Sequence, residues 1–427
     1  MSASILCTLP KPWLWCTLLG AALALAIYLL PREQRDIRYR AAGEWRLPGE
    51  FKLGGQRPVS VAVGTGFTSD GNWFRVVGSE LHIGPAPNDP PNSVLALPSA
   101  MPNSRSWSVV TSADGRRTIC SNERGLAVWR GAPPHELMHC WTVTTEPLAG
   151  MKVGEDRDGD TAYDRHELVL AYSPSPDGSM ASVFAIEQRG PSGPSGIVIV
   201  RDLESGQDLT ELVHDNCGPV IERVAWSRDS QRLATFAPKA NQITVWDVTK
   251  KDVICRIAEF AEQLSLSPDG SLVYTVFTGR TTTGTVGPDR PRTAVYRVAD
   301  GSLVGSRKIA CNQLVLSPDG KHAAASTPKE VTLLDSLTLQ DIWRSPGGGY
   351  RHIAFRRDGA ELAGLEMNLG GLVATSQVKA WNVADGSVLL DAPTNAGSGT
   401  THGVGFGQDG AIWTYGPSHW NRFEPAR

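Results

Sequence analysis

The stretch VAWSRDSQRLATFAPKANQITVWD, residues 224–247, decides the fold of this 427-residue chain. Its first segment places Val224 and Trp226 on one face, which is the two-residue period of a half-buried strand. A Ser-x-Asp turn at 227–230 follows, and a second strand runs from there to a hairpin. The stretch then ends in Ile243-Thr244-Val245-Trp246-Asp247, a third apolar strand. It therefore predicts three short antiparallel strands joined by tight turns.

The Ser-x-Asp turn is one of eight similar turns. They lie at 68–71, 112–115, 175–178, 227–230, 267–270, 317–320, 356–359 and 407–410. Most of the Asp-to-Asp intervals are about 40 to 50 residues, which is typical of propeller blades. Later turns such as 384–387 lead to a fourth strand. The sequence thus predicts an all-β protein, a β-propeller of four-stranded antiparallel blades, with eight blades favoured and seven as the alternative.

The quoted stretch resembles the WD40-type β-propeller family and its relatives with Ser-Pro-Asp-Gly turns. The resemblance covers roughly residues 45–427, although only one unit keeps the Trp246-Asp247 pair and His214 is the nearest counterpart of the family's Gly-His dipeptide. It implies a monomeric ring that serves as a platform for protein partners. The last unit has no obvious fourth strand after 420–423, so we expect Trp45 to Leu53 to supply that strand and close the ring.

An apolar segment precedes the repeats. Residues 13–30 contain no charge, and at about 1.5 Å per residue they are just long enough to span a bilayer as a helix. We therefore expect an N-terminal tail (1–12), a transmembrane anchor (13–30), a linker (31–44) and the propeller (45–427). A cleaved signal peptide is the alternative. Four arginines follow the span and only Lys11 precedes it, which favours a cytoplasmic propeller on a single-pass membrane protein.

Two motifs could bind metal. His135-Glu136-Leu137-Met138-His139 matches H-E-x-x-H, a zinc-protease motif that requires a helix. Pro133 and Pro134 precede the motif, and it lies where other units have their fourth strand, so we expect a blade strand there instead.

The better candidate for a metal site is an acidic loop whose oxygens have the spacing of an EF-hand-type calcium loop. Its ligands for a structural Ca²⁺ would be Asp156, Asp158, Asp160, Asp164 and Glu167. The alternative interpretation is a solvated acidic loop between blades.

Three long connections between second and third strands are expected on one face of the ring. They are 189–196, 278–292 and 366–376, and they are either binding loops or tolerated insertions.

The net charge of −3 provides no overall positive field that would attract nucleic acid, so we expect no nucleic-acid partner. We expect a membrane-anchored, non-catalytic scaffold that binds protein partners. The alternatives are a hydrolase or lactonase-like propeller with metal at the central channel, and an envelope-side propeller that assists membrane-protein assembly.

Overall fold

The computed structural model describes residues 39–46 and, with gaps, 64–425. The residues that the structure does not describe are 1–38, 47–63, 69–70, 78, 86–90, 100, 102–106, 113, 123–124, 132–134, 143–167, 189–193, 215–220, 222, 279–290, 310, 348, 369–374, 395–402, 417–418 and 426–427. The transmembrane prediction at 13–30 and the five predicted calcium ligands lie outside the described residues. Within the described part of the chain, no helix is long and apolar enough to cross a membrane.

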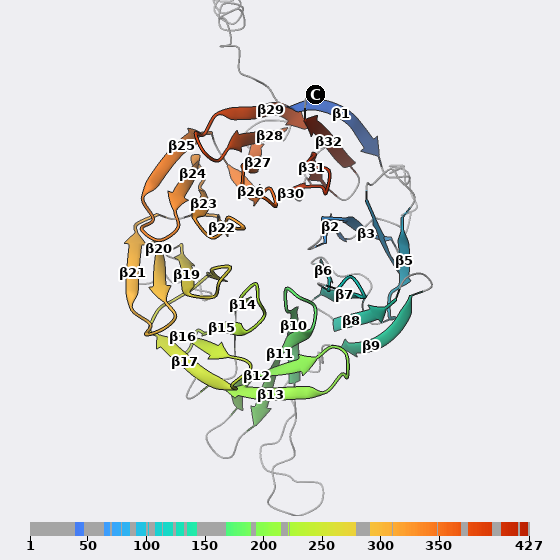
Figure 1. The fold of residues 1–427 in the computed structure, drawn as a ribbon, viewed down its shortest axis with the longest axis vertical. Helices are drawn as coiled ribbons and strands as arrows, with labels where there is room; N and C mark the ends of the chain where they lie inside the picture. Colours follow the sequence, from blue (N-terminus) through green and yellow to red (C-terminus); the bar gives the residue numbers. More distant parts are fainter. Residues whose placement is uncertain are drawn as a thin grey trace, which may run out of the picture.

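The described strands form eight four-stranded antiparallel sheets, which are the blades of a propeller (Figure 1). Blade 1 contains β2 (Gly64–Phe67), β3 (Trp73–Val77), β4 (Glu80–Gly84) and β5 (Ser93–Ala96), and blade 2 contains β6 (Trp107–Thr111), β7 (Arg117–Asn122), β8 (Gly125–Arg130) and β9 (Glu136–Thr142). Blade 3 contains β10 (Leu168–Pro174), β11 (Met180–Gln188), β12 (Pro194–Asp202) and β13 (Asp208–Val213), and blade 4 contains β14 (Arg223–Trp226), β15 (Arg232–Ala237), β16 (Gln242–Asp247) and β17 (Asp252–Ile257).

The second half of the ring repeats this pattern. Blade 5 contains β18 (Gln263–Leu266), β19 (Leu272–Phe277), β20 (Arg292–Arg297) and β21 (Leu303–Arg307), and blade 6 contains β22 (Gln313–Leu316), β23 (His322–Ser326), β24 (Glu330–Asp335) and β25 (Asp341–Pro346). Blade 7 contains β26 (Tyr350–Phe355), β27 (Glu361–Asn368), β28 (Thr375–Asn382) and β29 (Val388–Thr394), and blade 8 contains β30 (Gly403–Phe406), β31 (Ile412–Tyr415), β32 (His419–Pro425) and β1 (Tyr39–Arg46). The prediction of eight blades is confirmed.

Blade 8 combines both ends of the chain. Strand β1 pairs antiparallel with β32, so the N-terminal segment supplies the outermost strand and closes the ring. The closing strand begins at Tyr39, however, and ends at Arg46, whereas we expected it between Trp45 and Leu53. Residues 39–44, which we expected in the linker, therefore belong to the propeller. A register shift between Ala41 and Gly43 interrupts the two-residue alternation, which explains why the strand is hard to recognise in the sequence.

The eight turns connect the first and second strands of every blade and therefore lie on one face of the ring, which we name the turn face. In five turns the serine hydroxyl donates to the aspartate carboxylate at 2.5–2.7 Å, as at Ser112 and Asp114. The fourth position has a positive φ and is usually Gly, because this backbone conformation disfavours a side chain. The opposite face, which we name the loop face, carries the connections between second and third strands.

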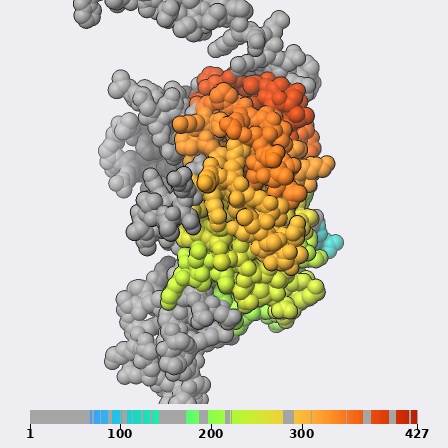
Figure 2. Space-filling model, turned by 90° about the vertical axis from the view of Figure 1, so that its left-hand side faces the viewer, coloured from blue at the N-terminus to red at the C-terminus, as the bar shows by residue number. Residues whose placement is uncertain are grey.

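The hydrophobic core lies between adjacent blades. Ile119 and Val128 of blade 2 pack with Val183 and Ile197 of blade 3, and equivalent clusters follow around the ring. Figure 2 shows blades 4 to 7 from the side, one beside the next along the rim. Where blade 8 meets blade 1, the buried cluster is aromatic and includes Trp73 and Trp420, whose ring centroids are 6.4 Å apart. This aromatic seam, together with β1, holds the ring closed.

Candidate functional site

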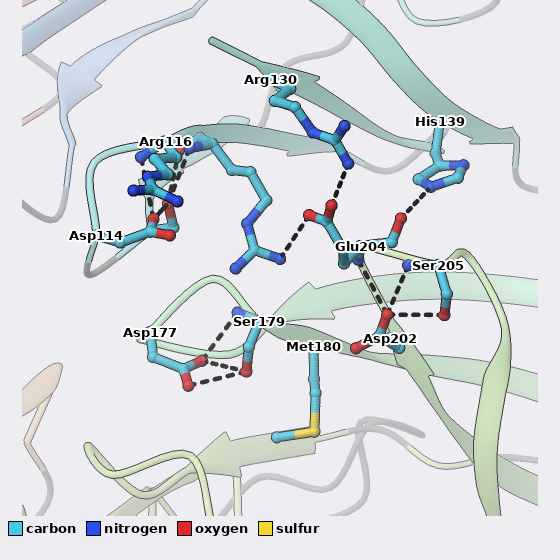
Figure 3. Close-up of polar contacts among 12 residues, drawn as sticks. Asp114, Arg116, Arg130, His139, Asp177, Ser179, Met180, Asp202, Glu204 and Ser205 are labelled. Atoms are coloured by element: carbon cyan, nitrogen blue, oxygen red, sulfur yellow. Dashed lines mark hydrogen bonds and ion pairs between the residues drawn. The ribbon is translucent and has the colours of Figure 1, made fainter.

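An arginine-rich depression on the turn face, between blades 2 and 3, is the candidate functional site (Figure 3). It encloses about 460 Å³ and is lined by Asp114, Arg116, Arg117, Arg130 and Glu204. We name these five residues the arginine notch. Arg116 and Arg117 lie at the turn into β7, Arg130 ends β8, and Glu204 follows β12 of the neighbouring blade. The notch therefore depends on the packing of two blades against each other.

The register of blade 2 concentrates positive charge. Arg117 and Arg130 are direct partners across β7 and β8. Like charges in opposite positions of an antiparallel pair repel each other, so this arrangement favours an anion nearby. Glu204 supplies one: its carboxylate accepts a charged hydrogen bond from Arg130 and lies 3.7 Å from Arg117 Nη1. The notch is thus an anion site that is occupied, in the structure, by a side chain of the chain itself.

The turn of blade 2 fixes the position of Arg116. Ser112 Oγ donates to Asp114 Oδ1 at 2.6 Å, and the Arg116 backbone N–H donates to the same oxygen at 3.0 Å. These two hydrogen bonds, with the charges of Arg117 and Arg116, lower the pKa of Asp114, so the carboxylate is ionised at neutral pH. The Arg116 side chain is exposed. Within the described part of the chain, no hydrogen bond or ion pair engages its guanidinium, which therefore remains available to a ligand.

The turn of blade 3 fixes the position of the Glu204 backbone and leaves its side chain outside these contacts. Asp202 Oδ1 accepts the N–H groups of Glu204 and Ser205 at 3.1 and 2.6 Å. The Glu204 carbonyl accepts from His139 Nε2 at 3.1 Å if that ring nitrogen carries the proton. The Glu204 side chain, by contrast, is 54% exposed, and Arg130 is 48% exposed. Ion pairs with this exposure contribute little to stability, about 0 to 1 kcal/mol, so an incoming carboxylate can displace Glu204 at low cost.

This geometry suits the binding of a carboxylate. A guanidinium offers its donors in a planar fork that matches the two oxygens of a carboxylate. Arg116 and Arg130 are the two accessible arginines of the notch. Arg117, whose side chain is 15% exposed, contributes a third positive charge beside them. An acidic side chain or a chain terminus entering the notch would thus meet two accessible guanidinium groups and one partly buried charge.

The H-E-x-x-H motif has a structural role. Glu136 to His139 belong to strand β9, as expected, and not to a helix. His135 Nε2 lies 2.8 Å from Ser93 Oγ of blade 1, whereas His139 stacks on Trp141 of its own strand with ring centroids 5.0 Å apart. The two histidines therefore contact different neighbours. Among the described residues, no group of three or more His, Cys, Asp or Glu side chains is placed to hold a metal ion.

Blade 4 contains a buried polar network. Thr235 Oγ1 lies 2.8 Å from His214 Nε2 and accepts from Trp246 Nε1 at 3.0 Å. All three residues are nearly inaccessible to water, with at most 4% exposure. His214 was singled out in the sequence as the nearest counterpart of the family histidine, and the structure places it in this network. The unit that keeps the Trp246-Asp247 pair therefore also contains this buried network.

The sequence did not reveal the notch. Its members come from positions 114, 116, 117, 130 and 204, and only the ring brings them together. One signal was present: once the strands of blade 2 are aligned, Arg117 and Arg130 are opposite each other. Two like charges in opposite positions repel each other, so such a pair indicates that an anion lies nearby. The three long connections that we expected to carry function lie largely outside the described residues.

Comparison with known proteins shows likeness at the level of the fold. No protein-family model and no curated protein sequence matches this chain. The structure is similar to Chaetomium thermophilum Sqt1, solved bound to the N-terminus of the ribosomal protein L10, with a TM-score of 0.53 and 14% identity over 86% of this chain and 92% of that chain.

Two further solved structures are more distant. A chain of the mitotic checkpoint complex has a TM-score of 0.47 and 12% identity over 73% of this chain and 84% of that one. Kuenenia stuttgartiensis hydrazine synthase has a TM-score of 0.41 and 19% identity over 57% of this chain and 72% of that one. The likeness to Sqt1, at 14% identity, shows a shared fold alone.

Proposed function

We propose that this chain is a membrane-anchored, non-catalytic propeller that serves as a scaffold for a protein partner, and that the arginine notch binds an acidic segment of that partner. The observation that carries the proposal is a pair of accessible arginines on the ring: within the described residues no ion pair engages Arg116, and Arg130 pairs with the half-exposed Glu204. Propellers present binding residues on turns that a stiff frame holds in place. Sqt1, a structural neighbour, was solved with a protein segment bound, which is consistent with such a role. The anchor is the apolar segment at 13–30.

The proposal is tested by comparing partners captured from detergent-solubilised membranes. The bait is the full chain, either wild type or with Arg116→Gln and Arg130→Gln. The matched control carries Lys239→Gln and Lys329→Gln, two exposed lysines in hairpins of the loop face, and loses the same charge. We expect a protein that the wild type and the control capture and the notch variant loses. Equal capture by the wild type and both variants would contradict the proposal.

Anchoring is tested separately by alkaline carbonate extraction of membranes that contain the full chain. An integral anchor keeps the protein in the membrane pellet, because an apolar span remains in the bilayer after peripheral proteins are released. A chain that lacks residues 1–30 should be released. Release of the full chain would contradict the anchor.

A further inference from the structure

The direction of strand β1 determines the face of the ring at which the N-terminal segment enters. In blade 8, β30 and β31 are joined on the turn face through 407–410, and β31 and β32 are joined on the loop face. His419, which begins β32, therefore lies at the loop face, and it pairs with Arg46 at the end of β1. At the opposite end, Tyr39 pairs with Pro425. The chain thus enters β1 from the turn face.

The distance from the predicted anchor to this point is short. Only residues 31–38 separate the apolar segment from Tyr39. Even fully extended, at about 3.4 Å per residue, they span roughly 27 Å. A blade strand of about six residues is itself roughly 20 Å long. If the loop face were nearer to the bilayer, most of the linker would be used in crossing the depth of the ring before it reached the membrane.

We infer that the turn face is directed toward the bilayer and the loop face away from it. The inference rests on the anchor in the proposed function. It specifies the kind of partner, because the arginine notch opens on the turn face and therefore into the space between ring and membrane. A partner that reaches the notch from this side is a membrane protein with an acidic segment next to its own transmembrane span. The loop face remains accessible from the aqueous side.

Strand β23 of blade 6 provides a matched pair of positions for a test. Lys321, in the turn before it, lies on the turn face, and Lys329, in the hairpin after it, lies on the loop face. Both are exposed lysines, so replacing either one disturbs no buried contact. A fluorescent amino acid is incorporated at position 321 or 329 of the full chain. The protein is reconstituted into phosphatidylcholine vesicles that carry an acceptor dye on their headgroups, and energy transfer to the acceptor is measured.

The inference expects greater transfer from position 321 than from position 329. Equal or reversed transfer, in protein that floats with the vesicles, would overturn the orientation while leaving the anchor intact. Protein that does not float with the vesicles would overturn the anchor and the orientation with it. A second pair in blade 4, Gln231 on the turn face and Lys239 on the loop face, should show the same order. Opposite orders in the two blades would indicate a ring standing on its edge, which also contradicts the inference.

Discussion

The polar network of blade 4 and the arginine notch are both built from groups that prefer water, yet they differ in their access to it. His214, Thr235 and Trp246 are almost completely buried and bond to one another. Arg130 and Glu204 also bond to each other but are about half exposed. A buried network is costly to disrupt, because any group left behind loses its partner without gaining water. An exposed ion pair can exchange its partner. The first cluster therefore maintains the fold, and the second is the proposed binding site.

The largest expected effect is in the buried network. Trp246→Ala removes a large side chain from the core between blades 3 and 4 and should lower the free energy of unfolding by about 3–5 kcal/mol. Denaturant unfolding measures this change, and Arg130→Ala is the comparison from the notch. A loss below about 1 kcal/mol for Trp246→Ala would show that the network does not hold blade 4 together.

A second prediction compares two glycines with the same backbone conformation. Gly178 and Gly115 have φ values of +67° and +68°, but a Cβ on Gly178 would lie 2.8 Å from both Ser112 Cα and Ile119 Cδ1, whereas a Cβ on Gly115 meets nothing within 4 Å. Gly115→Ala should therefore lower the free energy of unfolding by about 1–2 kcal/mol, the cost of the left-handed backbone alone.

Gly178→Ala should lower it by about 1–3 kcal/mol more, because overpacking displaces backbone beneath the notch. Thermal or denaturant unfolding of both variants measures the difference. Equal losses would mean that the contact between the turns of blades 2 and 3 is loose, and the notch could not then be a rigid site.

Within the notch, removing the internal anion should strengthen binding. Glu204→Gln keeps the size of the side chain and frees Arg117 and Arg130 from a competing charge. An interaction of about 1 kcal/mol at the surface corresponds to roughly fivefold tighter binding of an acidic peptide. Fluorescence anisotropy with labelled hexaglutamate measures the affinity, and the gain should diminish at high salt. Unchanged or weaker binding would indicate that Glu204 does not occupy the ligand position.

The smallest expected effect concerns pH. Hydrogen bonds from the Thr249 hydroxyl and from the Lys250 backbone N–H lower the pKa of Asp247 to about 2. Because this pKa is lower in the folded state, the stabilisation is complete above about pH 4 and is lost as the pH falls toward 2. Asp247→Asn should therefore flatten the acid end of a plot of unfolding temperature against pH. If the unfolding temperature of this variant fell with acid as steeply as that of the wild type, Asp247 would not be responsible for the loss of stability at low pH.

The ring was predictable from the sequence because its determinants are local. Each Ser-x-Asp turn makes its hydrogen bonds within a few residues, as from Ser227 to Asp229 at 2.5 Å, and so leaves a pattern that the chain repeats. The closing strand was misplaced because Tyr39–Arg46 contains a bulge and a glycine and thus lacks regular alternation.

The notch was not predictable, since Arg117, Arg130 and Glu204 meet only after two blades have packed together. We had instead expected function at motifs and loops that are conspicuous in the sequence. Of these, the H-E-x-x-H stretch is a strand, and the acidic and long loops lie outside the described residues. Local patterns thus specify the frame, whereas the charged site depends on contacts between units that are far apart in the sequence.

The most direct test of the notch as a binding site is one preparation of the Arg116→Gln/Arg130→Gln variant, measured for both stability and hexaglutamate affinity. Both side chains are accessible, so the free energy of unfolding should stay within about 1 kcal/mol of wild type. Peptide binding should be lost, while the Lys239→Gln/Lys329→Gln control should keep it. A stability loss of several kcal/mol would show that the notch belongs to the fold, and unchanged peptide binding would show that it is not the site.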